Sequence, residues 1–146
     1  TYALEDAKTK KMGEKARNLY QEILTKNPNN LLAKTNMAMT YVSTSTPMQG
    51  ILMLREVIAK EPEFEPALFN LGILSIRSNQ FGKAVERFKQ ILKINPANSK
   101  AALNLGYCLA ELDRTDEART ILEKVLANSK DPQEKAAANE ILSKLK

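Results

Sequence analysis

Residues 65–98 read EPALFNLGILSIRSNQFGKAVERFKQILKINPAN, and this stretch decides the fold. Apolar side chains recur every three or four residues in two segments of about 14 residues, which is the pattern of amphipathic helices. The run Ser-Asn-Gln-Phe-Gly at 78–82 separates the segments and is typical of a turn. Pro96 then ends the second segment, because proline lacks an N–H and disfavours helical backbone in the residue before it. The stretch predicts a helical hairpin.

The same pattern repeats along the chain with a period of 34 residues, marked by Pro28, Pro62 and Pro96. One column holds small residues, namely Ala16, Gly50, Ala84 and Ala118. Further columns hold large apolar residues, namely Tyr20, Leu54, Phe88 and Leu122, then Ile23, Val57, Ile91 and Val125. We therefore divide a single domain, 1–146, into a partial unit 1–30, units 31–64, 65–98 and 99–132, and a capping helix 132–146. In the partial unit we expect the second helix near 13–26.

Helix ends are also predicted. Thr46 before Pro47, and Thr115 before an acidic pair, have the residue types of N-caps. In the capping helix, we expect an apolar inward face of Ala136, Ala137, Ile141, Leu142 and Leu145.

The columns resemble the tetratricopeptide repeat, whose pattern is W-x2-L-G-x2-Y, then A-x3-F, then P. Leu71-Gly72, Ala84, Phe88 and Pro96 match it in one unit. The pattern is less complete elsewhere, since no unit has the Trp and Lys130 stands at one Pro position. The resemblance covers the whole chain and implies an all-α fold, a right-handed superhelix of helical hairpins.

In this family the first helix of each unit lines the concave side, which implies a peptide-binding groove here. Asn36, Asn70 and Asn104 recur at one groove column. A carboxamide donates and accepts hydrogen bonds, so a row of them could hold the backbone of an extended partner. The alternative is that each Asn forms local hydrogen bonds within its own repeat. A clamp for a terminal carboxylate is not expected, because the matched columns offer few cationic donors.

The neighbouring groove columns are apolar. They contain Met39, Phe69, Ile73, Leu103 and Tyr107. An exposed apolar wall of this kind typically binds a peptide or an amphipathic helix. The alternative is that some of these side chains pack on their own hairpin.

The composition argues against catalysis. The 146 residues include no His and one Cys, and the net charge is +5. Without His, a Cys–His nucleophile is excluded and the commonest metal ligand is missing, so we expect no metal site and no cofactor. Cys108 is interpreted as a buried small residue. The carboxylates Asp113, Asp116 and Glu117 are interpreted as a helix start, where negative charge is favourable. The basic residues form no continuous stripe, so we expect no nucleic-acid partner.

The predicted function is a non-catalytic scaffold or adaptor that binds a peptide or protein segment in the concave groove. The alternative is an assembly module that self-associates, or that forms the soluble part of a larger, membrane-anchored bacterial complex. No apolar run is long enough for this segment to insert in a membrane. The compartment, cytoplasmic or periplasmic, and the partner's identity do not follow from the sequence, and an upstream targeting segment could precede Thr1.

Overall fold

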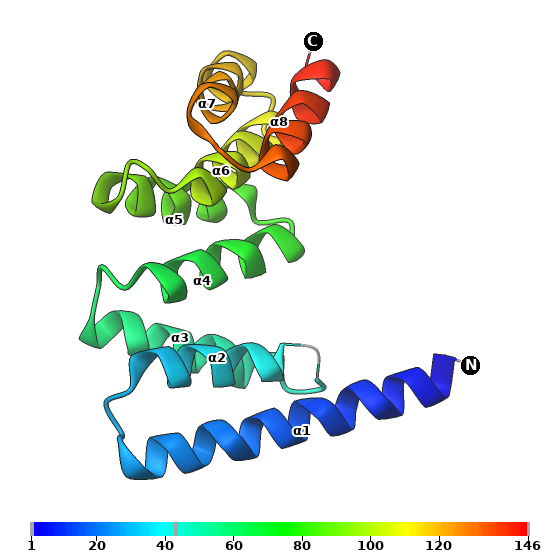
Figure 1. Cartoon of the computed structure of the whole chain (residues 1–146), viewed down its shortest axis with the longest axis vertical. Helices are drawn as coiled ribbons and strands as arrows, with labels where there is room; N and C mark the ends of the chain where they lie inside the picture. Colours follow the sequence, from blue (N-terminus) through cyan, green and yellow to red (C-terminus); the bar gives the residue numbers. More distant parts are fainter. Residues whose placement is uncertain (1, 43, 146) are drawn as a thin grey trace. The chain divides into compact units, whose positions relative to one another are not determined.

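The computed structural model describes residues 2–42 and 44–145 of the chain (Figure 1). This part contains eight α-helices and no strand, so the predicted all-α fold is confirmed. The helices are α1 (Tyr2–Lys26), α2 (Leu31–Tyr41), α3 (Pro47–Lys60), α4 (Glu65–Arg77), α5 (Phe81–Ile94), α6 (Ser99–Glu111), α7 (Thr115–Asn128) and α8 (Pro132–Lys144). The chain divides into two compact units, Thr1–Ala67 and Leu68–Lys146, and the boundary falls within α4.

In the first unit, α2 packs against both α1 and α3. Arg17 of α1 donates a hydrogen bond from Nη1 to the Thr40 carbonyl oxygen at 3.0 Å, and its guanidinium lies 4.9 Å from the centre of the Tyr41 ring. Gly50 of α3 faces the backbone of α2, where any added Cβ would collide with the carbonyl oxygen of Ala38. The small-residue column is therefore what allows α2 and α3 to approach closely.

In the second unit, the two helical hairpins, α4 with α5 and α6 with α7, resemble each other in how their helices pack. A Cβ added to Gly72 of α4 would lie 2.6 Å from the Phe88 ring of α5, and one added to Gly106 of α6 would lie 2.5 Å from Leu122 of α7. Phe88 and Leu122 are fully buried. Large apolar residues of the second helices thus fill the space left by glycines of the first helices, which excludes water from each hairpin.

The turns of these two hairpins have matching backbones. Asn79 and Asp113, which are 34 residues apart, have φ angles of 58° and 59°. This left-handed region is disfavoured for most side chains but tolerated by Asn and Asp. Turns occur where 78–82 and 113–116 were predicted, but they span 78–80 and 112–114, because residues 81–82 and 115–116 already belong to the following helices.

Two predicted helix starts are wrong. We expected a helix near 13–26, but α1 is a continuous helix from Tyr2, because residues 2–12 contain no proline or glycine to interrupt it. Thr46 stands at the N-cap position of α3 as predicted, but its side chain makes no capping hydrogen bond. In α7 the N-cap position is occupied by Arg114, and Thr115 is the first helical residue.

The inward face of α8 also differs from the prediction. Ala137, Ile141, Leu142 and Leu145 are partly buried, but Ala136 is exposed and Ala138 is fully buried instead. Glu134 is buried as well, and its carboxylate accepts a hydrogen bond of 2.6 Å from Ser129 Oγ. The orientation of α8 on α6 and α7 decides this face, and helical periodicity alone could not choose between the adjacent alanines.

Candidate protein-binding surface

The structure places the eight predicted groove residues on the first helices of hairpins. Asn36 and Met39 lie on α2 in the first unit. The other six lie in the second unit, with Phe69, Asn70 and Ile73 on α4, and Leu103, Asn104 and Tyr107 on α6. All eight side chains are half-buried. Their assignment to a binding groove stays a prediction.

The aromatic residues of this set are held by rings on another helix. Phe69 packs edge to face on Phe88, with centroids 5.6 Å apart and planes at 71°. Tyr107 packs in the same way on Phe81, the first residue of α5, at 6.1 Å and 72°. Part of each ring therefore packs against a neighbouring helix, in line with the alternative that some groove side chains pack within the repeats. The rest of each ring is accessible to solvent. Rings held in this way offer apolar surface without a large loss of side-chain entropy on binding.

The three asparagines are not equivalent. Asn104 donates a hydrogen bond from Nδ2 to the carbonyl oxygen of Lys100 at 2.9 Å, one turn earlier in α6. This is the local role proposed as the alternative to backbone recognition. Within the described part of the chain, the side chains of Asn36 and Asn70 make no hydrogen bond, so their donors and acceptors are available to a partner.

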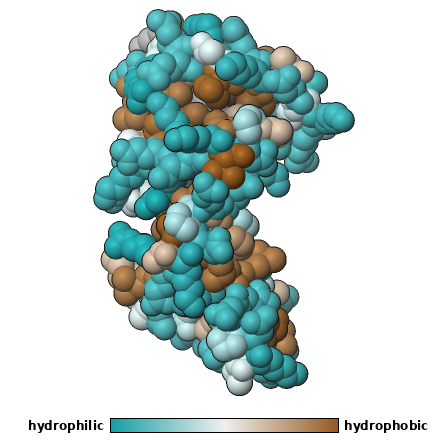
Figure 2. Space-filling view, turned by 90° about the vertical axis from the view of Figure 1, so that its left-hand side faces the viewer, coloured by the Kyte–Doolittle hydropathy of each residue, from teal (hydrophilic) through white to brown (hydrophobic). Residues whose placement is uncertain are grey.

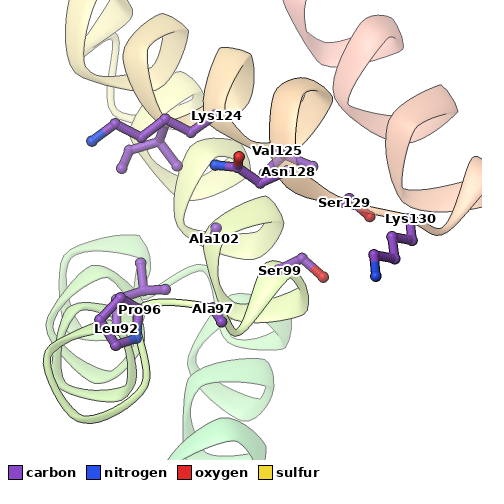
Figure 3. A pocket seen from close by; sticks show the side chains of 11 residues that line it. Leu92, Pro96, Ala97, Ser99, Ala102, Lys124, Val125, Asn128, Ser129 and Lys130 are labelled. Carbon is purple, nitrogen blue, oxygen red and sulfur yellow. The ribbon is translucent and has the colours of Figure 1, made fainter.

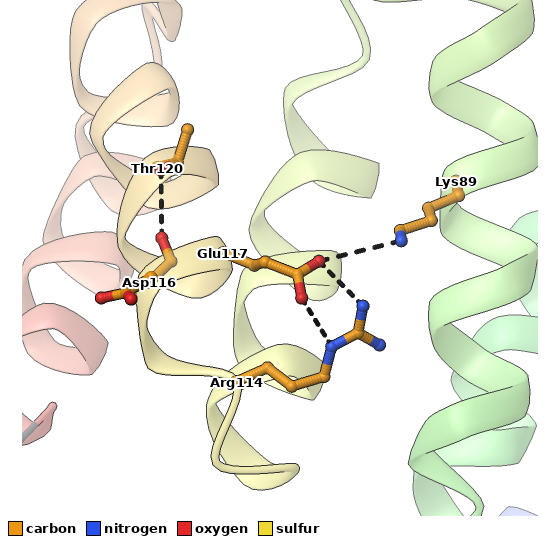
Figure 4. Close-up of polar contacts among 5 residues, drawn as sticks. All are labelled: Lys89, Arg114, Asp116, Glu117 and Thr120. Carbon is orange, nitrogen blue, oxygen red and sulfur yellow. Dashed lines mark hydrogen bonds and ion pairs between the residues drawn. The ribbon is translucent and has the colours of Figure 1, made fainter.

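A charged cluster lies near the start of α7 (Figure 4). Arg114 donates two hydrogen bonds of 2.8 Å to the carboxylate of Glu117, and Lys89 Nζ approaches the same carboxylate at 4.0 Å. The Arg114 hydrogen bond lowers the pKa of Glu117, and the charges of Arg114 and Lys89 add to the effect. These contacts link Arg114, at the N-cap position of α7, to Glu117 in the first turn, which agrees with the structural interpretation of Glu117.

Cys108 is fully buried in α6. Burial, followed by the nearby charge of Glu111, raises the pKa of its thiol to about 12. A thiol that stays protonated at neutral pH is a poor nucleophile, so Cys108 is a packing residue. Among the described residues, no cluster of His, Cys, Asp or Glu could hold a metal ion, and no helix is long and apolar enough to cross a membrane.

Sequence reasoning missed a pocket of about 710 Å³ in the second unit (Figure 3). It lies where the end of α5, the start of α6 and the end of α7 meet. Its lining is mainly apolar and comprises Leu92, Pro96, Ala97, Ser99, Ala102, Ile121, Lys124, Val125, Asn128, Ser129 and Lys130. Most of these residues belong to helix ends or to the segments between helices. Helical periodicity in the sequence does not show that such residues lie close together in space. Of the lining residues, only Pro96 and Val125 belong to the repeat columns described above.

The face of the molecule shown in Figure 2 is mainly hydrophilic, with apolar residues gathered in patches. In the first unit, the large apolar side chains most exposed to solvent are Met12, Leu19, Met48, Leu32 and Leu52. Of these, Met12 and Leu19 belong to α1, which the groove prediction did not include.

Helical hairpins with glycine-mediated contacts and a 34-residue period define a helical-repeat protein. A family model described as tetratricopeptide repeat matches residues 75–141. The structure superposes on a solved structure of MamA with a TM-score of 0.69 and 18% identity, covering 96% of this chain and 90% of that one. It superposes on PilF of Pseudomonas aeruginosa with a TM-score of 0.77 and 19% identity, covering 97% of this chain and 63% of that one. Residues 75–141 therefore match the tetratricopeptide repeat, and the chain has the fold of these helical-repeat structures.

Among curated proteins, Hsp70-Hsp90 organizing protein 3 of Arabidopsis thaliana is 23% identical over 95 residues. The match covers 65% of this chain and 17% of that protein, so the chain spans about a fifth of this relative's length or less. None of these three proteins carries an enzyme's name, and tetratricopeptide repeats are generally non-catalytic interaction modules.

Proposed function

We propose that this protein is a non-catalytic scaffold whose α4 and α6 surface binds an extended segment of a partner protein. The observation that carries the proposal is the pair of anchored rings, Phe69 on Phe88 and Tyr107 on Phe81, on helices that also carry available polar groups. The name of the Arabidopsis relative, an organizing protein for two other proteins, supports a scaffold role.

In the proposed mechanism, apolar side chains of the partner pack against Phe69, Ile73, Leu103 and Tyr107. Asn70, whose carboxamide has no intramolecular partner in the described chain, bonds to a peptide group of the ligand. In the first unit, Asn36 and Met39 of α2 are a separate candidate contact site. Asn104 contributes less, because one of its N–H groups already bonds to Lys100.

Site-specific crosslinking tests the location. We would place p-benzoylphenylalanine at Ile73 and, as a matched control in the same unit, at Ile94 of α5, and expose both proteins to lysate from the source. We expect Ile73 to give the stronger crosslink to a defined partner segment. Equal or stronger capture at Ile94 would contradict the proposed surface.

The asparagine roles are tested with the captured segment as a synthetic peptide. Losing one net hydrogen bond costs about 0.5–1.5 kcal/mol, or roughly a 2- to 12-fold weaker Kd. We expect this loss for Asn70→Ala and a smaller one for Asn104→Ala. The Asn36→Ala, Asn70→Ala, Asn104→Ala triple variant, checked for folding by circular dichroism, measures the whole row. Unchanged affinity in the triple variant would assign the amides a structural role.

Self-association, alone or within a larger membrane-anchored assembly, is the second candidate. The exposed Met48 and Leu52 of α3 favour it. It predicts a mass that increases with concentration in light scattering, whereas a constant monomer mass would contradict it.

A further inference from the structure

The 34-residue period allows the exposure of α1 to be compared with that of the other second helices. Ile23 shares its column with Val57, Ile91 and Val125, which are 0%, 0% and 2% exposed. Ile23 is 41% exposed. All four residues of this column are β-branched and aliphatic. Ile23 alone among them is not covered by neighbouring side chains in the described structure.

The cover in the other hairpins is a first helix. Gly72 and Gly106 of first helices contact Phe88 and Leu122, one turn before the Ile23 column. In the described chain α1 packs on α2, through the face that carries Arg17, and lies beside it in Figure 1.

The uncovered residues of α1 form one stripe. Met12, Leu19 and Ile23 are spaced by seven and four residues, so they share a face of the helix. Met12 and Leu19 are 63% and 61% exposed. Arg17 lies on a different face, about 140° around the helix from Met12. The stripe is therefore separate from the α1–α2 contact.

The last helix does not complement this stripe. The residues of α8 that correspond by period to the hairpin-facing side of α6 are Ala136, Asn139, Glu140 and Ser143. All four are exposed. A second copy would therefore bring mostly polar groups to the stripe through α8, which argues against head-to-tail stacking.

One border of the stripe is basic. Helical geometry places Lys8, Lys15 and Lys26 along one edge, together with a single carboxylate, Glu22. All four side chains are exposed. Two stripes facing each other would bring lysines close to lysines, whereas a partner with carboxylates along its edge would be attracted.

We propose that the Met12–Leu19–Ile23 stripe docks an acidic amphipathic helix of a partner protein, which takes the place of a first helix on α1. The partner helix presents aliphatic and small residues to the stripe and carboxylates to Lys8, Lys15 and Lys26. This surface lies in the first unit and is distinct from the α4 and α6 surface, so each proposal can fail without the other.

The probe is a fluorescent synthetic helix of about 21 residues, long enough to be partly helical alone. It carries Leu and Ala on one face, Glu on both edges of that face and Gln elsewhere; a matched probe has Lys in place of every Glu. Binding to the 146-residue chain is measured by fluorescence anisotropy at low salt, where charge effects are largest. We expect the Glu probe to bind at least about tenfold more tightly than the Lys probe.

Two double variants locate the binding. Leu19→Ser with Ile23→Ser removes the stripe, and Met48→Ser with Leu52→Ser removes an equally spaced, exposed apolar pair of α3. All four residues are at least 41% exposed, and circular dichroism checks that helix content is unchanged. We expect the first variant to bind the Glu probe at least about tenfold more weakly and the second to bind it normally.

A charge reversal gives an independent test. Lys8→Glu with Lys15→Glu should exchange the preference, so that the Lys probe binds more tightly than the Glu probe. Equal affinity of the two probes for the unmodified chain, or equal binding by the Leu19/Ile23 variant, would overturn the proposal. A mass that increases with concentration in the unmodified chain, and is constant only in the Leu19/Ile23 variant, would also overturn the proposal, since a second copy would then occupy the stripe. Binding to phosphatidylglycerol vesicles that only the Leu19/Ile23 variant loses would overturn it as well, since the occupant would then be a membrane.

Discussion

The ring of Phe88 occupies the space into which a side chain at Gly72 would project, with its Cζ 2.6 Å from the position of an added Cβ. Because Phe88 is fully buried and packs on Phe69, it cannot move aside without disturbing other contacts. The close approach of α4 and α5 thus depends on having no side chain at residue 72.

Gly72→Ala should destabilise the second unit. Alanine favours a helix by about 1 kcal/mol over glycine, but overpacking typically costs about 1–3 kcal/mol, so we expect net loss. Gly82→Ala is the control, because a Cβ there meets nothing within 4 Å and the helix should gain stability. Urea unfolding followed by circular dichroism measures both. A Gly72→Ala protein as stable as the Gly82→Ala protein would contradict the packing argument.

Asn79 should tolerate glycine better than alanine. Its φ of 58° costs a residue with an ordinary Cβ about 1–2 kcal/mol, whereas glycine adopts it freely. We expect Asn79→Ala to lower the free energy of unfolding by about 1 kcal/mol relative to Asn79→Gly. The substitutions Asp113→Ala and Asp113→Gly repeat the comparison at the second turn. Identical unfolding midpoints for the Ala and Gly variants at both turns would exclude backbone strain at positive φ as a factor in stability.

Arg114→Gln should raise the pKa of Glu117 towards its ordinary value of 4.5, because the largest cause of the lowered pKa is the Arg114 hydrogen bond. A carboxylate with a lowered folded pKa stabilises the protein above its unfolded pKa, and this contribution is lost as the pH falls below 4.5 through the folded pKa. An NMR titration of the Glu117 side-chain carboxylate measures the shift directly. Lys89→Gln should raise the pKa of Glu117 by less. A larger rise in the Glu117 pKa for Lys89→Gln than for Arg114→Gln would contradict the assignment of Arg114 as the main cause.

Cys108 should react with a thiol reagent only when the second unit opens. Its pKa of about 12 leaves almost no thiolate at pH 8, and its side chain is fully buried. Because the raised pKa favours the protonated folded state, its stabilising effect is full below the ordinary thiol pKa of 9.0 and declines as the pH rises towards 12. Labelling by an aromatic disulfide, with and without urea, tests this. Rapid labelling of the native chain would show that the site is accessible.

Local sequence determined the hairpins of this protein. Apolar residues at helical spacing, the turn residues before Phe81 and the prolines that end second helices act within a few residues of each other, so their pattern predicts helices and turns directly. The column of Gly50, Ala84 and Ala118 likewise indicated where helices come close.

Tertiary structure alone decided what each repeated residue does. Asn104 bonds to Lys100 while Asn70 has no such bond, although both occupy the same column. Ile91 is fully buried and Ile23 is exposed, although both lie on the same face of a second helix. The reason is physical: burial and hydrogen bonding depend on which neighbouring helix is present and how it is oriented, and a residue's position in the repeat does not contain that information.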